Sequence, residues 1–138
     1  MKLIVLAAGK WTRLRPLTNT IPKPLINICG KSILEHNLES LYEYVNEIII
    51  VVKYLEEKIK EKLWDNYKWV KITYHRQVDK KGTWAALLWI NSDSDVCVIY
   101  WDSIFDKKDF DKVMNHKWYW VLAKEVENPE KYEIFNVN

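Results

Sequence analysis

Apolar residues of this chain fall into two patterns, short continuous runs and stretches with helical spacing. Continuous runs bounded by polar residues are typical of buried parallel strands, and alternation is typical of a strand with one covered face. These patterns predict strands at Lys2–Ala7, Glu47–Val52, Val70–His75, Val96–Tyr100, Trp118–Val126 and Tyr132–Val137. Helical spacing predicts helices at Ser32–Val45, Tyr54–Leu63, Gly82–Ile90 and Asp106–His116, with Ser32 as the N-cap of the first.

The alternation of strands with helices predicts an α/β fold. We expect a three-layer, doubly wound, mainly parallel sheet of the Rossmann-like kind, formed by a single domain over residues 1–138. Ligands of such sheets bind outside the carboxyl ends of the strands. The loops Ala8–Arg15, Gln77–Trp84 and Trp101–Phe105 each follow a predicted strand, so we expect them to meet at one site.

Charge and hydropathy limit the partners and the cellular environments that are compatible with the sequence. The chain has 21 basic and 19 acidic residues, interleaved, and a formal net charge of +2, which argues against a nucleic-acid partner. Its apolar runs are too short to span a membrane, and the first is too short for a signal peptide. Cys29 and Cys97 are isolated in the sequence, as expected for the reduced thiols of a cytoplasmic protein.

The segment Gly9–Leu25 (GKWTRLRPLTNTIPKPL) carries the first chemical signal. It resembles the G-x-G-T-R-L-x-P-L-T and P-K-P-L segments of the sugar-1-phosphate nucleotidyltransferases, such as the glucose-1-phosphate thymidylyl- and uridylyltransferases. The resemblance implies an NTP and a sugar phosphate as substrates. It implies that Arg13 holds the β- and γ-phosphates and that Lys23 neutralises the α-phosphate and the sugar phosphate. Nucleotide-binding groups are then expected at Ala8, Gly9 and Thr12.

Cations suit this reaction for a physical reason. Nucleotidyl transfer concentrates negative charge around the α-phosphorus, so it depends on cations and amide donors more than on a protein nucleophile. On the residues alone, Arg13 and Lys23 are equally compatible with a solvated polar loop, and the ordered match along the segment favours the catalytic interpretation. The chain resembles the N-terminal part of the family's catalytic domain, a truncated nucleotidyltransferase core.

Three later segments extend the resemblance. The segment QVDKKGTW resembles Q-x-x-x-x-G-T-A, which implies that Gln77 and Gly82 bind the base; a glutamine amide donates and accepts side by side, as uracil and thymine require. Trp101–Phe105 resembles G-D-x-x-F, which implies that Asp102 binds Mg²⁺ with the phosphates, the alternative being a helix cap. Asn128–Ile134 resembles a segment that lies near the sugar. The family's second metal aspartate and its downstream sugar-binding residues have no counterpart here.

Tryptophan and glycine occur in abnormal numbers. The chain has 8 Trp and 3 Gly, whereas glycine averages roughly 7% of residues, about ten in a chain of this length. Compared with the family pattern, Trp11, Trp64, Trp69 and Trp101 stand where glycine is expected, and Trp84 stands where a small residue is expected. Each exchange replaces a residue suited to backbone freedom or close approach. This pattern indicates deliberate engineering.

The tryptophans leave three functional interpretations open. In the first, the chain is an enzyme domain whose nucleotide pocket is occupied by Trp11, Trp84 and Trp101, so little or no turnover is expected. In the second, it is a binding module whose aromatic patch recognises a protein partner, a second copy of the chain or a flat apolar ligand. The candidate interface consists of Trp11, Trp84, Trp101, Trp118 and Trp120. In the third, the tryptophans only fill cavities or stiffen the backbone.

Overall fold

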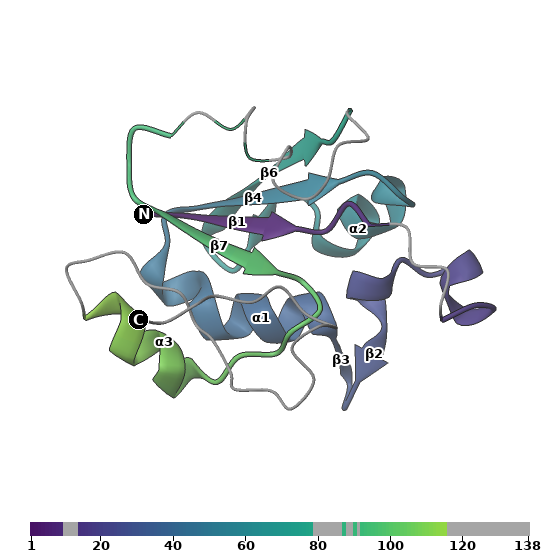
Figure 1. Ribbon diagram of the computed structural model, residues 1–138, viewed down its shortest axis with the longest axis horizontal. Helices are drawn as coiled ribbons and strands as arrows, with labels where there is room; N and C mark the ends of the chain where they lie inside the picture. The colour runs from purple at the N-terminus through teal and green to yellow at the C-terminus, as the bar shows by residue number, and fades with distance from the viewer. Residues whose placement is uncertain (10–13, 79–86, 88–89, 91, 116–138) are drawn as a thin grey trace, which may run out of the picture.

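A mainly parallel sheet forms the centre of the molecule. The computed structural model describes residues 1–9, 14–78, 87, 90 and 92–115 (Figure 1). The strands of the sheet are, in spatial order, β5 (Asn66–Tyr67), β6 (Val70–Arg76), β4 (Glu47–Val52), β1 (Lys2–Leu6) and β7 (Val96–Tyr100). Four of them run parallel, and β5 pairs antiparallel with β6 at one edge. The predicted α/β sheet is confirmed.

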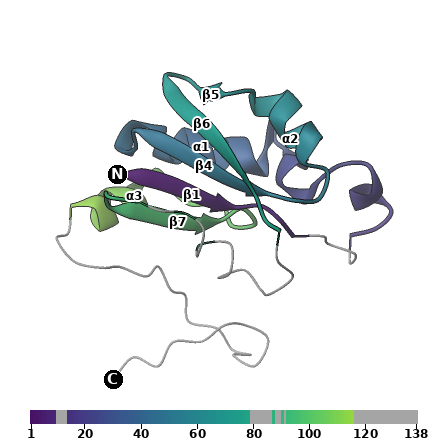
Figure 2. The same ribbon diagram turned by 90° about the horizontal axis from the view of Figure 1, so that it is seen from above.

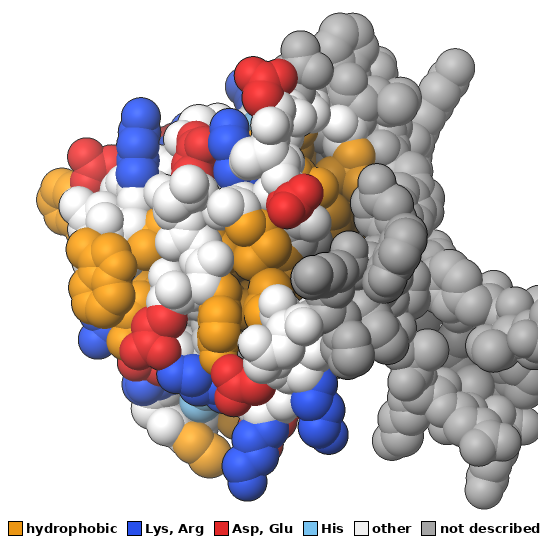
Figure 3. All heavy atoms as spheres, turned by 90° about the vertical axis from the view of Figure 1, so that its left-hand side faces the viewer, with side chains coloured by type: hydrophobic (Ala, Val, Ile, Leu, Met, Phe, Trp, Pro, Cys, Tyr) orange, Lys and Arg blue, Asp and Glu red, His pale blue; other side chains and the backbone are white. Residues whose placement is uncertain are grey.

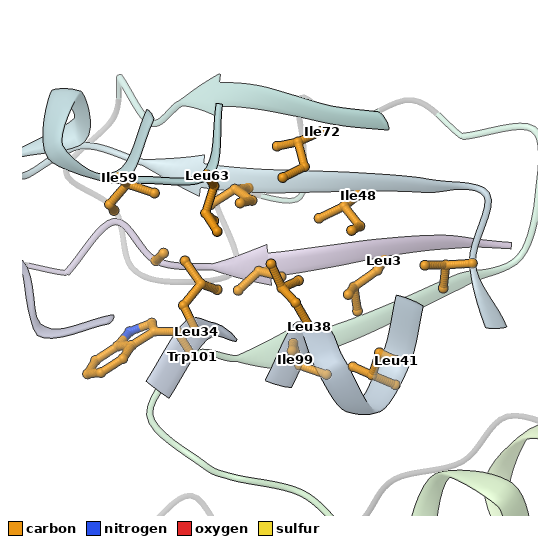
Figure 4. Packing of buried hydrophobic residues seen from close by; sticks show 14 of the residues in the cluster. Leu3, Leu34, Leu38, Leu41, Ile48, Ile59, Leu63, Ile72, Ile99 and Trp101 are labelled. Atoms are coloured by element: carbon orange, nitrogen blue, oxygen red, sulfur yellow. The ribbon is translucent and has the colours of Figure 1, made fainter. Parts of the chain in front are cut away.

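Helices cover one face of this sheet. They are, in the described part of the chain, α1 (Ile33–Leu41), α2 (Glu56–Leu63) and α3 (Lys107–Met114). In the view of Figure 2 the strands lie in front of α1. Strand residues such as Leu3 and Ile48 meet the helices in one core (Figure 4). Full burial of each such aliphatic side chain stabilises the fold by roughly 1.5–3 kcal/mol, which explains the helical spacing of the apolar residues.

The opposite face of the sheet is buried at its centre. A second cluster there consists of Ile4, Leu6, Ile49 and Val51, with Leu87 and Ile90 packed against it. Because β1 and β4 are covered on both faces, their sequences are continuous apolar runs rather than alternating ones. Most of the helix expected at Gly82–Ile90 lies outside the described residues, as do the strands expected at Trp118–Val126 and Tyr132–Val137.

The first helix begins at the predicted residue. The Ser32 hydroxyl accepts a hydrogen bond from the backbone N–H of Glu35 (3.2 Å), and the Glu35 carboxylate accepts one from the backbone N–H of Ser32 (2.8 Å). This reciprocal capping box satisfies two N–H groups that have no partner within the helix. The helix that was predicted to reach Val45 ends at Leu41 and continues as a 3₁₀ turn, η3 (Tyr42–Tyr44).

The other two helices also begin close to the predicted positions. α2 begins at Glu56 rather than Tyr54, because Leu55 has a left-handed backbone (φ 51°) that cannot be part of the helix. α3 begins after Asp106, whose side chain accepts a hydrogen bond from the backbone N–H of Lys108 (2.8 Å). Helix starts set by a side-chain cap are thus closer to the sequence pattern than the one set by backbone geometry.

Short elements precede α1. They are two 3₁₀ turns, η1 (Leu17–Asn19) and η2 (Lys23–Leu25), and an antiparallel hairpin of β2 (Asn27–Ile28) and β3 (Lys31–Ser32). The hydrophobic pattern predicts none of them, because elements of two or three residues show no periodicity.

The surface and the thiols agree with the composition. Figure 3 shows the face at the amino ends of the strands, where basic and acidic side chains are interspersed. Cys29 and Cys97 are both free, and burial raises the pKa of the Cys97 thiol to about 11. Within the described residues, no helix has the length and hydropathy that a bilayer span requires.

Candidate active site at the carboxyl edge of the sheet

The parallel strands end at one edge of the sheet. β1 pairs with β4 and β7 in a register that sets Leu6 beside Val51 and Tyr100, and the arrowheads of these strands point the same way in Figure 1. Gly9 and Asp102 each follow one of these ends closely in the sequence. The predicted nucleotide-binding turn and the predicted metal ligand therefore start from the same edge.

Gln77 is fixed at this edge by its backbone. The β4–β6 register ends with Val52 beside Arg76, and the backbone N–H of Gln77 donates to the carbonyl of Val52 at 3.0 Å. The Gln77 side chain is partly buried. The amide predicted to read a base thus stands directly after β6, whereas its predicted companion Gly82 lies outside the described residues.

Contacts with α2 and the residues before it hold the loop that carries Lys23. The Tyr54 hydroxyl donates to the carbonyl of Thr18 (3.2 Å), and the Lys58 ammonium donates to the carbonyl of Thr20 (2.5 Å). Thr18 is itself buried. These contacts fix the path of the chain through η1, so that η2 starts at Lys23 from an anchored backbone.

Lys23 contacts the residue that precedes Asp102. Its Nζ lies 4.6 Å from the centroid of the Trp101 ring, a distance at which an ammonium is attracted to the face of an indole. Lys23 comes from the loop after β1 and Trp101 from the end of β7. The structure therefore brings together the loop of the predicted phosphate-binding cation and the loop of the predicted metal-binding carboxylate.

Helix α1 holds the segment that contains Asp102. The buried Asn37 amide donates to the carbonyl of Trp101 (3.5 Å), and the Ser40 hydroxyl donates to the carbonyl of Phe105 (3.3 Å). The two donors thus contact both ends of the segment. Sequence reasoning missed them, although a fully buried asparagine among the apolar positions of α1 was the signal that could have revealed them.

The Trp101 side chain points into the core. Only 3% of its surface is exposed, and it belongs to the same cluster as Leu34 of α1 (Figure 4). A side chain buried in this way is not accessible to a partner. Of the two orientations compatible with the sequence, packed inward or facing outward, Trp101 has the inward one. Trp64 and Trp69 differ from it, with 75% and 73% of their surfaces exposed.

Other predicted site residues lie outside the described part of the chain. They are Thr12, Arg13, Gly82 and the candidate-interface residues Trp11, Trp84, Trp118 and Trp120. Among the described residues, no group of three or more His, Cys, Asp or Glu side chains could hold a metal ion. Asp102 is an exposed carboxylate at a strand end. Such a donor fits Mg²⁺, which is often held by one or two carboxylates and completed by substrate oxygens.

Known proteins have sequences similar to this chain. The family model described as nucleotidyl transferase matches residues 2–132. The bifunctional protein GlmU of Methanocaldococcus jannaschii is 40% identical over 136 residues, which are 97% of this chain and 32% of that protein. The UTP–glucose-1-phosphate uridylyltransferase AglF of Haloferax volcanii is 40% identical over 109 residues, 77% of this chain and 45% of that protein. The chain thus spans less than half the length of these relatives.

Solved structures give the same result for the fold. A UDP-glucose pyrophosphorylase solved with UDP-glucose superposes with a TM-score of 0.67 at 23% identity, over 81% of this chain and 52% of that one. The structure of HddC from Yersinia pseudotuberculosis superposes with a TM-score of 0.63 at 30% identity, over 83% and 54%. With the family model matching almost the whole length, the chain belongs to the nucleotidyl transferase family.

Proposed function

We propose that this chain is the N-terminal part of a catalytic domain that joins an NTP and a sugar 1-phosphate to give an NDP-sugar and pyrophosphate. The observation that carries the proposal is the contact of Lys23 with Trp101, because it brings the loop of this cation to the strand-end segment that contains Asp102. The name of one relative, a UTP–glucose-1-phosphate uridylyltransferase, agrees with this substrate class.

The proposed reaction is a displacement at the α-phosphorus. An oxygen of the sugar phosphate forms the new P–O bond while the bond to the bridging oxygen of the β-phosphate breaks, and that oxygen leaves with the electron pair as pyrophosphate. Lys23 neutralises charge that develops at the α-phosphate, and Arg13 does so at the leaving pyrophosphate. Gln77 pairs with the base edge. Asp102 would hold Mg²⁺, which would supply further charge neutralisation.

The tryptophans impair this site in the chain as it stands. The indole of Trp101 occupies the space against Lys23, and a tryptophan side chain is one of the largest that a pocket can receive. Trp11 and Trp84 belong to the two other loops of the predicted site. We propose that nucleotide binding is weak and turnover low for this reason. Since Trp101 is buried, it contributes no surface to the alternative function of a binding module.

Calorimetric titration with UTP or dTTP and Mg²⁺ tests the proposal. The chain itself should show little saturable heat, and the triple variant Trp11→Gly, Trp84→Gly, Trp101→Gly should bind one of the nucleotides. In that background Lys23→Ala should weaken binding about tenfold or more, because hydrogen bonds to charged groups contribute roughly 1.5–3 kcal/mol. Lys108→Ala, an exposed lysine on α3, is the matched control and should change nothing. A folded triple variant that binds neither nucleotide would contradict the proposed function.

A further inference from the structure

The numbers of tryptophan and glycine complement each other. Together the 8 Trp and 3 Gly are about as many as glycine alone averages in a chain of this length, roughly ten. An excess of one residue type that matches the deficit of another suggests that one has replaced the other throughout. The described tryptophans allow this to be tested against backbone conformation and packing.

Trp64 has a backbone conformation that glycine favours. It ends α2 with φ 57° and ψ −139°, close to a region that residues with a Cβ avoid and that glycine enters readily. The backbone is fixed there from both sides. Its N–H donates to the carbonyl of Lys60 (2.7 Å), and its carbonyl accepts from the Tyr74 hydroxyl (2.5 Å). Glycine is also the residue most common directly after a helix.

Burial of the Trp64 side chain does not offset this strain. With 75% of its surface exposed, it recovers little of the roughly 2 kcal/mol that full burial of a large apolar side chain supplies. An indole that stabilised the fold would be found where it packs. The backbone at position 64 therefore favours glycine, and the packing of the side chain gives no reason for tryptophan.

Trp69 lies in a tight turn in which its residue type, rather than its own φ, is unusual. β5 and β6 pair through Tyr67 and Val70, so the connection is the two-residue loop of Lys68 and Trp69. Such loops strongly prefer a pair that contains glycine. Here Lys68 has a positive φ (54°) and Trp69 does not. Trp69 stands where a pair such as Asn-Gly has its glycine, with 73% of its surface exposed and its ring 4.9 Å from that of Tyr42.

We infer that the tryptophan positions of this chain are glycine positions in the protein as its source organism makes it, because the codon behind them is decoded as glycine. If one codon is read as glycine in one genetic code and as tryptophan in another, translation with the second code puts tryptophan in place of glycine wherever that codon occurs. No other residue type changes, which agrees with the excess of tryptophan and the deficit of glycine. UGA is such a codon, since it is read as stop in the standard code and as tryptophan or glycine in reassigned codes. Engineering for a binding surface would account for the exposed indole of Trp64, but not for its placement at a position that strains the backbone.

The inference changes what the site can do. With glycine at position 101, the indole that now lies against Lys23 is absent, and the buried space that it fills in the core cluster is vacated. The impairment proposed above is then a property of the tryptophan-bearing sequence. On the proposed function, the glycine form is then the one that binds nucleotide.

The direct test is the natural protein. Peptides from it that span positions 64 and 69 should have masses that correspond to glycine, and the gene should carry UGA at all eight tryptophan positions. Tryptophan in these peptides, or UGG codons in the gene, would overturn the inference. Neither readout depends on catalytic activity, so failure of the proposed function would leave this result unaffected.

A second test uses the recombinant chain and isolates the backbone. Trp64→Gly should raise the urea midpoint of unfolding, because glycine relieves the strain at positive φ. Trp64→Ala is the matched control. It removes the same indole but keeps a Cβ, so it should give a smaller rise or none. Equal midpoints for the two variants would show that position 64 has no preference for glycine and would count against the inference.

Discussion

Helices α1 and α2 lie on the same face of the sheet, but different forces set their ends. α1 begins with a reciprocal cap between Ser32 and Glu35. α2 begins after the left-handed Leu55, which makes no side-chain cap, and it ends at the strained Trp64. Both helices bury apolar residues in the common core. The comparison shows that α1 is specified by its own sequence, whereas α2 depends more on contacts with the rest of the molecule.

Deletion of core side chains should affect both helices equally. Leu38 of α1 and Ile59 of α2 are fully buried in the same cluster. Leu38→Ala and Ile59→Ala should each lower the free energy of unfolding by about 3 kcal/mol, the sum of lost burial and a residual cavity. Urea denaturation measures both, with Glu61→Ala on the exposed side of α2 as the control. A much smaller loss for Ile59→Ala would mean that the helices differ in packing and not only at their ends.

Removal of the cap should affect α1 alone. Ser32→Ala leaves the N–H of Glu35 without its acceptor, and the expected loss in free energy of unfolding is about 1 kcal/mol. Ser103→Ala, an exposed serine after β7, should be neutral in the same urea measurement. If Ser32→Ala were also neutral, the start of α1 would depend on packing in the way that we attribute to α2.

Removal of the hydrogen bond between α2 and the Lys23 loop should have a smaller effect on stability. Lys58→Ala removes the hydrogen bond to the carbonyl of Thr20, a net contribution of roughly 0.5–1.5 kcal/mol at an exposed site. Hydrogen exchange should show faster exchange in η1 and η2, while α1 stays protected. Glu61→Ala serves again as the control. Unchanged exchange in the loop would remove α2 from its proposed supporting role.

Acid should weaken the cap of α1 by a small amount. Burial acts to raise the pKa of Glu35, but hydrogen bonds with Ser32 and the ion pair with Lys62 outweigh it, so the pKa is lowered. A lowered pKa in the folded state means that this stabilisation is fully present above the ordinary pKa of glutamate, near 4.5, and is lost as pH falls through the lowered value. Urea midpoints from pH 7 to pH 3 should therefore fall less steeply in Glu35→Gln. Parallel pH profiles would contradict this.

The parts of the fold that the sequence predicts are those with a local cause. β4 and β7 have the predicted bounds, because continuous apolar runs mark their ends. Ser32 was identified as a cap because its chemistry acts within three residues. The two-residue strands of the β2–β3 hairpin and β5 have too few residues to show a pattern.

The features of the candidate site also differ in whether the sequence predicts them. Lys23, Gln77 and Asp102 are candidates from their motifs, and the structure places each after a strand or in the loop that follows it. The contact of Lys23 with Trp101 and the support from Asn37 depend on how distant segments pack. Spacing along the chain contains no information about such contacts, so only the fold reveals them.

The anchored loop before β2 has a consequence for the thermodynamics of binding. Fixing one backbone residue costs roughly 1–2 kcal/mol of conformational entropy, and a ligand that orders a loop must supply this from its own contacts. Around Thr18 and Thr20 the folded protein has already met that cost through Tyr54 and Lys58. A phosphate that reaches Lys23 therefore meets a charge on a backbone that is already ordered, and more of the electrostatic attraction remains as affinity.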